Sequence, residues 1–129
     1  MEIEVASHVV AQLLAEARNA HPRECCGILL GEGARITHAT PAQNVHPAPE
    51  THFEIDPQTL IDAHRKARSG GAQVLGYYHS HPVGKAEPSS TDAAMASGDG
   101  SLWAIIAGGE IRLWRDVSQE FREVSYGVN

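Results

Sequence analysis

The sequence is poor in aromatic residues and in basic side chains, and both shortages exclude classes of protein. Phe, Trp and Tyr make up 5% of the 129 residues, so the core must consist mainly of Val, Ile, Leu and Ala. Ten Lys and Arg accompany sixteen Asp and Glu, which gives a formal charge of −6. That balance argues against sequence-independent binding to nucleic acid. The remaining composition, 42% apolar and 20% charged, is that of an ordinary soluble domain.

The chain also lacks a disulfide framework, a long apolar run and a signal peptide. Its two cysteines, Cys25 and Cys26, are adjacent, and a bridge between neighbouring cysteines is strained. No apolar run approaches the roughly 18 residues of a membrane span. The N-terminal residues are acidic, whereas a signal peptide begins with a positively charged region. We therefore expect a cytoplasmic protein without a membrane partner, in which both cysteines are small buried hydrophobic residues.

The length of 129 residues is typical of one domain, and no repeat or linker divides it. Apolar residues at helical spacing predict a helix over 7–20, with Ser7 as its N-cap. Asp56 as an N-cap predicts a second helix that ends at Gly70. A short third helix is expected over 90–96. The expected apolar face of the second helix comprises Leu60, Ile61, His64 and Ala67.

Short apolar or alternating segments bounded by turn residues predict strands. These segments are 25–30, 34–40, 52–55, 74–79, 102–107, 111–115 and 121–124. The aromatic residues on them are expected in the core, namely Tyr77, Tyr78, Trp103 and Trp114. The order of the elements predicts a mixed α/β (α+β) fold in which helices pack against one sheet.

Eight histidines are the first sign of chemistry, because histidine is the commonest metal ligand. His79 and His81 end a predicted strand and, two residues apart, point to the same face. Twice the strand rise separates them by about 6.6 Å, so both rings can reach one zinc ion. Pro82 then ends the strand. With this histidine content, chance alone produces about half a His-x-His pair per chain, so the pair is weak evidence by itself.

Asp92 has two interpretations. Ser89 and Asp92 match the capping box of a short helix, which needs no metal. Alternatively, the loop brings Asp92 back to the strand end as a third metal ligand. Three protein ligands with an open fourth position are typical of catalytic zinc, whereas structural sites have four. No cysteine lies near the pair to provide the fourth ligand.

Together, His79-x-His81, seven intervening residues and Ser89-x-x-Asp92 resemble the JAMM motif of the MPN+ (Mov34/MPN/PAD-1) metalloproteases. That motif includes an upstream glutamate, and Glu24 stands in a Pro-x-Glu-x-Cys-Gly-x-x-x-Gly context similar to the short prokaryotic members. The resemblance covers essentially the whole chain. It implies a single catalytic domain over residues 1–129. The implied fold is MPN/JAMM-like (cytidine-deaminase-like), with a mixed β-sheet flanked by helices.

The resemblance also implies roles. His79, His81 and Asp92 would bind one Zn²⁺ per chain together with a water molecule. Glu24 would deprotonate that water, whose pKa zinc lowers to about 7. Ser89 would donate a hydrogen bond to the oxyanion, which is typically worth 10²–10³ in kcat. This role competes with helix capping for the same hydroxyl. The remaining histidines are expected at the surface or in packing, with His64 packed on the second helix.

Members of this family hydrolyse amide or isopeptide bonds after the C-terminal Gly-Gly of a ubiquitin-like or sulfur-carrier protein. The resemblance implies such a partner, and the segment after Asp92 has no room for the insertion of the eukaryotic deubiquitinases. A non-catalytic MPN scaffold that binds a protein partner is the alternative. The His-x-Glu…Pro-Cys-x-x-Cys pattern of zinc deaminases and the HExxH pentapeptide are both absent.

Overall fold

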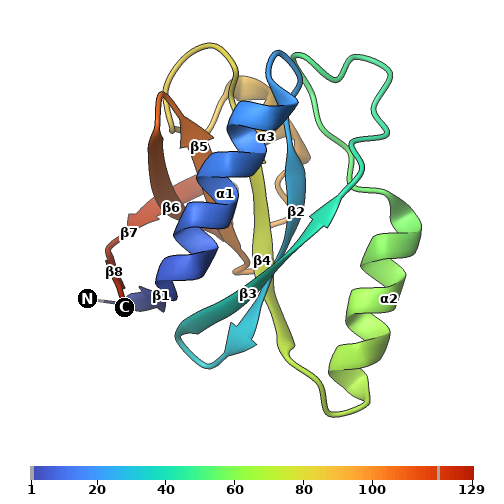
Figure 1. Ribbon diagram of the computed structural model, residues 1–129, viewed down its shortest axis with the longest axis vertical. Helices are drawn as coiled ribbons and strands as arrows, with labels where there is room; N and C mark the ends of the chain where they lie inside the picture. Colours follow the sequence, from blue (N-terminus) through green and yellow to red (C-terminus); the bar gives the residue numbers. More distant parts are fainter. Residues whose placement is uncertain (1, 119) are drawn as a thin grey trace.

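The computed structural model describes residues 2–118 and 120–129 and contains one mixed eight-stranded sheet with flanking helices (Figure 1). In chain order the elements are β1 (Ile3–Val5), α1 (Ser7–Ala20), β2 (Cys26–Glu32), β3 (Arg35–Ala42), α2 (Pro57–Arg68), β4 (Gln73–Ser80), α3 (Ser90–Met95), β5 (Leu102–Ala107), β6 (Glu110–Val117), β7 (Glu120–Val124) and β8 (Tyr126–Val128). The predicted mixed α/β (α+β) architecture is confirmed.

The strand order is β7-β6-β5-β4-β2-β3-β1-β8. β4 lies near the middle, antiparallel to β2 and parallel to β5. The parallel β4–β5 pair requires a crossover, and that crossover contains α3. The loop after β4 and the start of α3 therefore lie near the carboxyl end of a central strand.

The two faces of β4 belong to two different parts of the core. Tyr78 is fully buried in the cluster that includes Val9 and Leu13 of α1. Tyr77 points the other way and packs on the cluster of Phe53, Trp103 and α2 side chains. This alternation follows from the two-residue period of a strand. In Figure 1, α1 crosses in front of the sheet and α2 lies to its right.

One strand prediction is wrong, and two short strands were not predicted. Residues 52–55 do not form a strand, and only Ile55 makes an isolated bridge, with Asn44. The backbone N–H of Glu54 instead donates to the Asn44 side chain, which replaces a strand partner. The sequence also gave no indication of β1 and β8, which are three residues each and pair with one another at the sheet edge.

The predicted helices are present, but their details differ. Ser7 is the first residue of α1, and Ala6 precedes it without any side-chain cap. Asp56 does precede α2, yet its carboxylate accepts from the Thr59 hydroxyl at 3.0 Å and makes no cap bond to the backbone. Ile61 and His64, two of the four residues expected on the apolar face of α2, are exposed, because the buried residue of this helix is Ala63.

Tyr78 and Trp103 are buried as expected, whereas Tyr77 and Trp114 are only partly buried. Over residues 2–118 and 120–129, every helix is too short or too polar to cross a membrane.

Candidate metal centre

Three segments meet at one end of the central strands β2 and β4. His79 is the next-to-last residue of β4, and His81 follows the end of the strand. Because β2 runs antiparallel to β4, its first residue, Cys26, lies opposite His79. Glu24 therefore reaches the end at which the histidines stand. The third segment is the N-terminus of α3, which supplies Asp92.

The side chains of His79, His81 and Asp92 face one another. The Nε2 atom of His79 lies 3.1 Å from Oδ1 of Asp92, and Nε2 of His81 lies 3.1 Å from Oδ2. The two Nε2 atoms are 3.1 Å apart. Tetrahedral zinc with bonds of 2.0–2.1 Å holds its ligand atoms about 3.3 Å apart. These three donors thus fit one ion, and the remaining tetrahedral position has no protein ligand among the described residues.

The surroundings hold both rings in orientations suited to a metal. Nδ1 of His81 lies 2.8 Å from the backbone carbonyl of Lys85, which can only accept, so this nitrogen carries the proton. When Nε2 is deprotonated, as metal binding requires, its lone pair would be directed at the centre, the usual arrangement for a metal-binding histidine. The His79 ring stacks on the Phe53 ring with 4.3 Å between the ring centroids. It packs edge-on against Trp103 with 5.7 Å between the centroids.

Burial and hydrogen bonds set the charges of the three groups. Burial lowers the pKa of His79, which favours the neutral imidazole that binds metals. Burial would raise the pKa of Asp92, but hydrogen bonds from His79 and His81 outweigh it and hold that pKa well below its usual range. For His81, burial is likewise outweighed, and contacts with Asp92 and the Lys85 carbonyl raise its pKa. Without a metal, the centre therefore holds an ionised carboxylate that accepts hydrogen bonds from both imidazoles, and a metal would replace the protons on their Nε2 atoms.

Glu24 differs from the other acidic residues considered in the sequence. Its side chain is buried, with 6% of its surface exposed, whereas Glu32, Glu50, Glu54 and Glu87 are exposed. Burial raises the pKa of Glu24 to about 7; the charge of His81 opposes this shift and that of Asp92 adds to it. A carboxyl group with a pKa near neutrality suits proton transfer at physiological pH.

Ser89 and Asp92 form the predicted capping box. Oγ of Ser89 accepts from the backbone N–H of Asp92 at 3.0 Å, and Oδ2 of Asp92 accepts from the backbone N–H of Ser89 at 2.9 Å. Capping uses a lone pair of the hydroxyl and leaves its O–H free to donate. The expected competition between capping and oxyanion binding therefore does not arise. Asp92 also combines both of its interpretations, since one carboxylate caps α3 and faces the histidines.

The loop between His81 and Ser89 is fixed by contacts that sequence reasoning did not anticipate. The indole N–H of Trp114 donates to the carbonyl of Ala86 at 3.1 Å. Arg112 of the same strand pairs with Glu87 at 3.0 Å. Both partners on β6 lie far along the chain, and no local signal marks them. They hold the segment that supplies the Lys85 carbonyl to His81.

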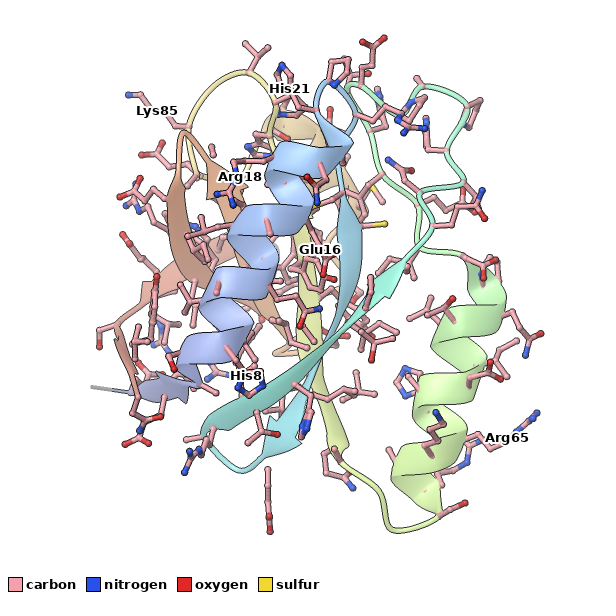
Figure 2. All side chains as sticks on the ribbon, in the orientation of Figure 1. His8, Glu16, Arg18, His21, Arg65 and Lys85 are labelled. Carbon is pink, nitrogen blue, oxygen red and sulfur yellow. The ribbon has the colours of Figure 1, made fainter. Side chains whose placement is uncertain are left out.

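The other histidines and the cysteines lie outside the centre. Figure 2 shows His8 and His21 at opposite ends of α1. Within the part of the chain that the structure describes, His79, His81 and Asp92 are the sole group of three metal-binding side chains. Cys25 and Cys26 are buried free thiols, as expected. Burial raises their pKa values to about 11 and about 12, so both stay protonated.

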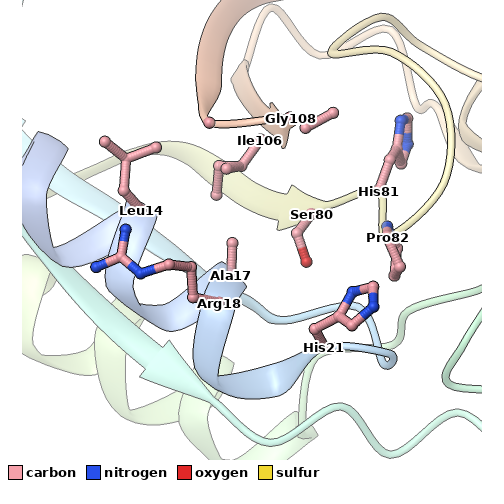
Figure 3. Close-up of a pocket in the computed structure, with 11 residues that line it drawn as sticks. Leu14, Ala17, Arg18, His21, Ser80, His81, Pro82, Ile106 and Gly108 are labelled. Atoms are coloured by element: carbon pink, nitrogen blue, oxygen red, sulfur yellow. The ribbon is translucent and has the colours of Figure 1, made fainter.

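Cavities lie on both faces of the sheet near the centre. One, of about 450 Å³, opens on the α1 side between Leu14, Ala17, Ser80 and Ile106, and Arg18 and His21 stand at its edges (Figure 3). The other, of about 390 Å³, lies on the α2 side, where Phe53 and Trp103 separate it from His79. A further one, of about 390 Å³, is lined by Glu24 and Asn44.

The family model for prokaryotic homologues of the JAB domain matches residues 6–117. A desampylase of Haloferax volcanii is 36% identical over 110 residues, which are 83% of this chain and 79% of that protein. A probable TtuB-protein conjugate cleaving protease of Thermus thermophilus is 39% identical over 86 residues, 67% of this chain and 55% of that one. The CysO-cysteine peptidase of Mycobacterium tuberculosis is 29% identical over 105 residues, 80% of this chain and 71% of that one.

Solved structures show the same fold. Protein DSY2949 from Desulfitobacterium hafniense superposes with a TM-score of 0.85 at 28% identity, over 98% of this chain and 92% of that one. A JAB1/MPN domain protein from Archaeoglobus fulgidus superposes with a TM-score of 0.66 at 18% identity, over 98% of this chain and 96% of that one. The predicted MPN/JAMM-like fold is confirmed.

Proposed function

The chain belongs to the family of prokaryotic homologues of the JAB domain, and we propose that it is a zinc-dependent metallopeptidase. It hydrolyses the amide or isopeptide bond that follows the C-terminus of a ubiquitin-like or sulfur-carrier protein. One observation carries the proposal: two imidazoles and a carboxylate converge within 4.8 Å of one another beside a buried glutamate. We further propose that residues 1–129 form a single catalytic domain.

The names of the relatives support this substrate class. They describe a desampylase, a protease that cleaves TtuB–protein conjugates and a CysO-cysteine peptidase. These names are consistent with the release of a group attached to a ubiquitin-like or sulfur-carrier protein. We expect the carrier tail to end in Gly-Gly, because a narrow groove accepts an extended strand without side chains and binds it through main-chain hydrogen bonds.

Each residue of the centre has a proposed role. His79, His81 and Asp92 hold one zinc ion per chain. When bound, zinc acts as a Lewis acid and lowers the pKa of water to about 7. Glu24 accepts the proton of the attacking water and passes it to the leaving amine, for which its pKa of about 7 is well matched. Ser89 keeps its O–H available to donate to the oxyanion while its oxygen caps α3.

The alternative is a non-catalytic scaffold that binds a protein partner. A scaffold has no need of a complete set of three ligands or of a buried carboxyl group with a raised pKa, and this chain has both. Location in the cytoplasm and the absence of nucleic-acid and membrane partners stay predictions.

The test uses a carrier protein that ends in Gly-Gly and is fused to a short peptide. We expect the purified chain to hold about one zinc per molecule and to cleave after the second glycine, as measured by mass spectrometry. Glu24→Gln should retain zinc and lose at least about 100-fold in kcat. Glu54→Gln, at an exposed acid, serves as the matched control and should behave as the unsubstituted chain. A chain without bound metal, or a fully active Glu24→Gln variant, would refute the proposal.

A further inference from the structure

Glu24 lies outside regular secondary structure, between the end of α1 and the start of β2. Its position must therefore be fixed by other contacts. On the β4 side, the following residue is held by Ser80: the N–H of Cys25 donates to Oγ of Ser80 at 2.8 Å, and the N–H of Ser80 donates to the carbonyl of Cys25 at 3.1 Å. These bonds leave both backbone groups of Glu24 to be satisfied from the opposite side.

The opposite side is a loop, residues 43–56, organised around Asn44. Nδ2 of Asn44 donates to the carbonyl of Glu24 at 3.1 Å and to that of His52 at 3.0 Å, with a longer contact to Pro49 at 3.5 Å. Oδ1 of Asn44 accepts from the backbone N–H groups of His46 and Glu54, both at 3.1 Å. All nitrogen partners are carbonyls and all oxygen partners are N–H groups, so the orientation of the amide is unambiguous.

The loop holds the second backbone group of Glu24 as well. The N–H of Glu24 donates to the carbonyl of Pro49 at 2.7 Å. The backbone of Asn44 is itself anchored by the bridge to Ile55. One amide side chain thus joins both ends of the loop to the residue that carries the buried carboxyl group.

We propose that Asn44 is a positioning residue that fixes Glu24 against the metal centre through the Glu24 carbonyl and the Pro49 segment. This inference rests on the proposed function of Glu24. In this proposal the amide acts on Glu24 through the backbone of that residue. Misplacing a reacting group by about 1 Å can cost roughly 10²-fold in rate, so the loss of the Asn44 hydrogen bonds should lower kcat measurably.

Two variants separate the hydrogen bonds that the Asn44 amide nitrogen donates from those that its oxygen accepts. Asn44→Ala removes all contacts. Asn44→Asp is nearly isosteric and keeps an oxygen for the N–H groups of His46 and Glu54, but it cannot donate to the Glu24 carbonyl. His46→Ala is the matched control, because His46 lies in the same loop, accepts from Ala48 at 2.9 Å and stacks on His52 without touching Glu24.

The first readout is amide hydrogen exchange by NMR, which needs neither metal nor activity. We expect exchange of the Glu24 amide to rise at least about 10-fold in Asn44→Asp and to stay unchanged in His46→Ala, with Ile28 of the central strand unchanged in both. A uniform increase across the strands, or unchanged exchange at Glu24, overturns the inference, because Asn44 would then act only on overall stability or not on Glu24 at all.

The second readout is the kinetics of the zinc-loaded protein. Asn44→Asp should lower kcat by roughly 10- to 100-fold with KM and zinc content unchanged. In a Glu24→Gln background the same substitution should have no further effect, measured in single turnovers at high enzyme concentration. Equal losses in both backgrounds overturn the inference. An inactive unsubstituted chain would instead refute the proposed function, while hydrogen exchange would still decide whether Asn44 holds Glu24.

Discussion

One carboxylate oxygen of Asp92 both faces His81 and takes part in the N-terminal cap of α3. Its Oδ2 lies 3.1 Å from Nε2 of His81 and accepts the backbone N–H of Ser89 at 2.9 Å. The proposed metal binding and the start of α3 therefore share a single carboxylate. Four predictions follow from this geometry and from the burial of Glu24.

Asp92→Asn should separate the two roles of this side chain. The amide oxygen can still accept the Ser89 N–H, so the helix cap is retained, but the negative charge between the two imidazoles is lost. We expect zinc affinity to fall at least about 100-fold, since even outer partners of metal ligands are worth 10- to 100-fold. Competition titration with a chromogenic chelator measures the change. Asp62→Asn, at an exposed position on α2, should leave the affinity unaltered.

Ser89→Ala removes the cap and the proposed oxyanion donor together, and the two losses differ in size. Loss of the cap should lower the free energy of unfolding by about 1 kcal/mol. Loss of the donor should lower kcat by about 10²–10³. Ser89→Thr keeps the hydroxyl and should retain most of both quantities. Urea unfolding and steady-state kinetics on the same preparations measure them, and a kcat close to normal in Ser89→Ala would exclude the oxyanion role.

Glu24 should make the metal-free protein less stable as the pH rises. Its folded-state pKa of about 7 lies above the unfolded value of 4.5, so the folded state binds this proton more tightly. The free energy of unfolding then falls as the pH rises from about 4.5 to about 7, by up to about 3 kcal/mol. Glu24→Gln should remove this fall and raise the melting temperature at pH 8 but hardly at pH 4. Calorimetry at both pH values is the test; identical pH profiles would mean that burial does not perturb Glu24.

Zinc should stabilise the fold by mass action, since the three ligands come together only in the folded chain. At free zinc of 100 times the dissociation constant the gain is about 2.7 kcal/mol. Addition of a chelator should lower the melting temperature accordingly and stop cleavage. His81→Ala should melt at one temperature with or without chelator. A chelator effect of the same size in that variant would place the stabilising metal elsewhere.

The sequence predicts the parts of the site that follow local rules. The two-residue spacing of His79 and His81 on a strand and the Ser89–Asp92 capping box both depend on nearby residues, and both are present. The placement of Glu24 was indicated by family resemblance alone. Its local sequence resembles that of any surface acid, and its burial depends on distant segments that hold residues 24 and 25, namely Ser80 of β4 and the loop around Asn44.

Other features depend on contacts between distant residues, and the sequence contains no pattern for them. Asn44 replaces strand pairing in residues 52–55, so an alternating segment that looks like a strand becomes a loop. The strands β1 and β8 are too short for periodicity, and they are defined by pairing alone: β1 lies between β3 and β8, and β8 is the edge strand. His64 matched the helical spacing of an apolar face, but the packing of α2 centres one residue away, on Ala63.

The pairing of Cys26 with His79 has a consequence for how the chain acquires activity. The proposed base and metal ligands lie on segments far apart in the sequence, and only a correctly registered β2–β4 ladder brings them together. A shift by one residue would turn the side chains to the opposite face. Contacts of such long sequence separation form late and slowly. A nascent or partly unfolded chain is therefore an inert hydrolase, and the onset of cleavage during refolding reports the completion of the sheet.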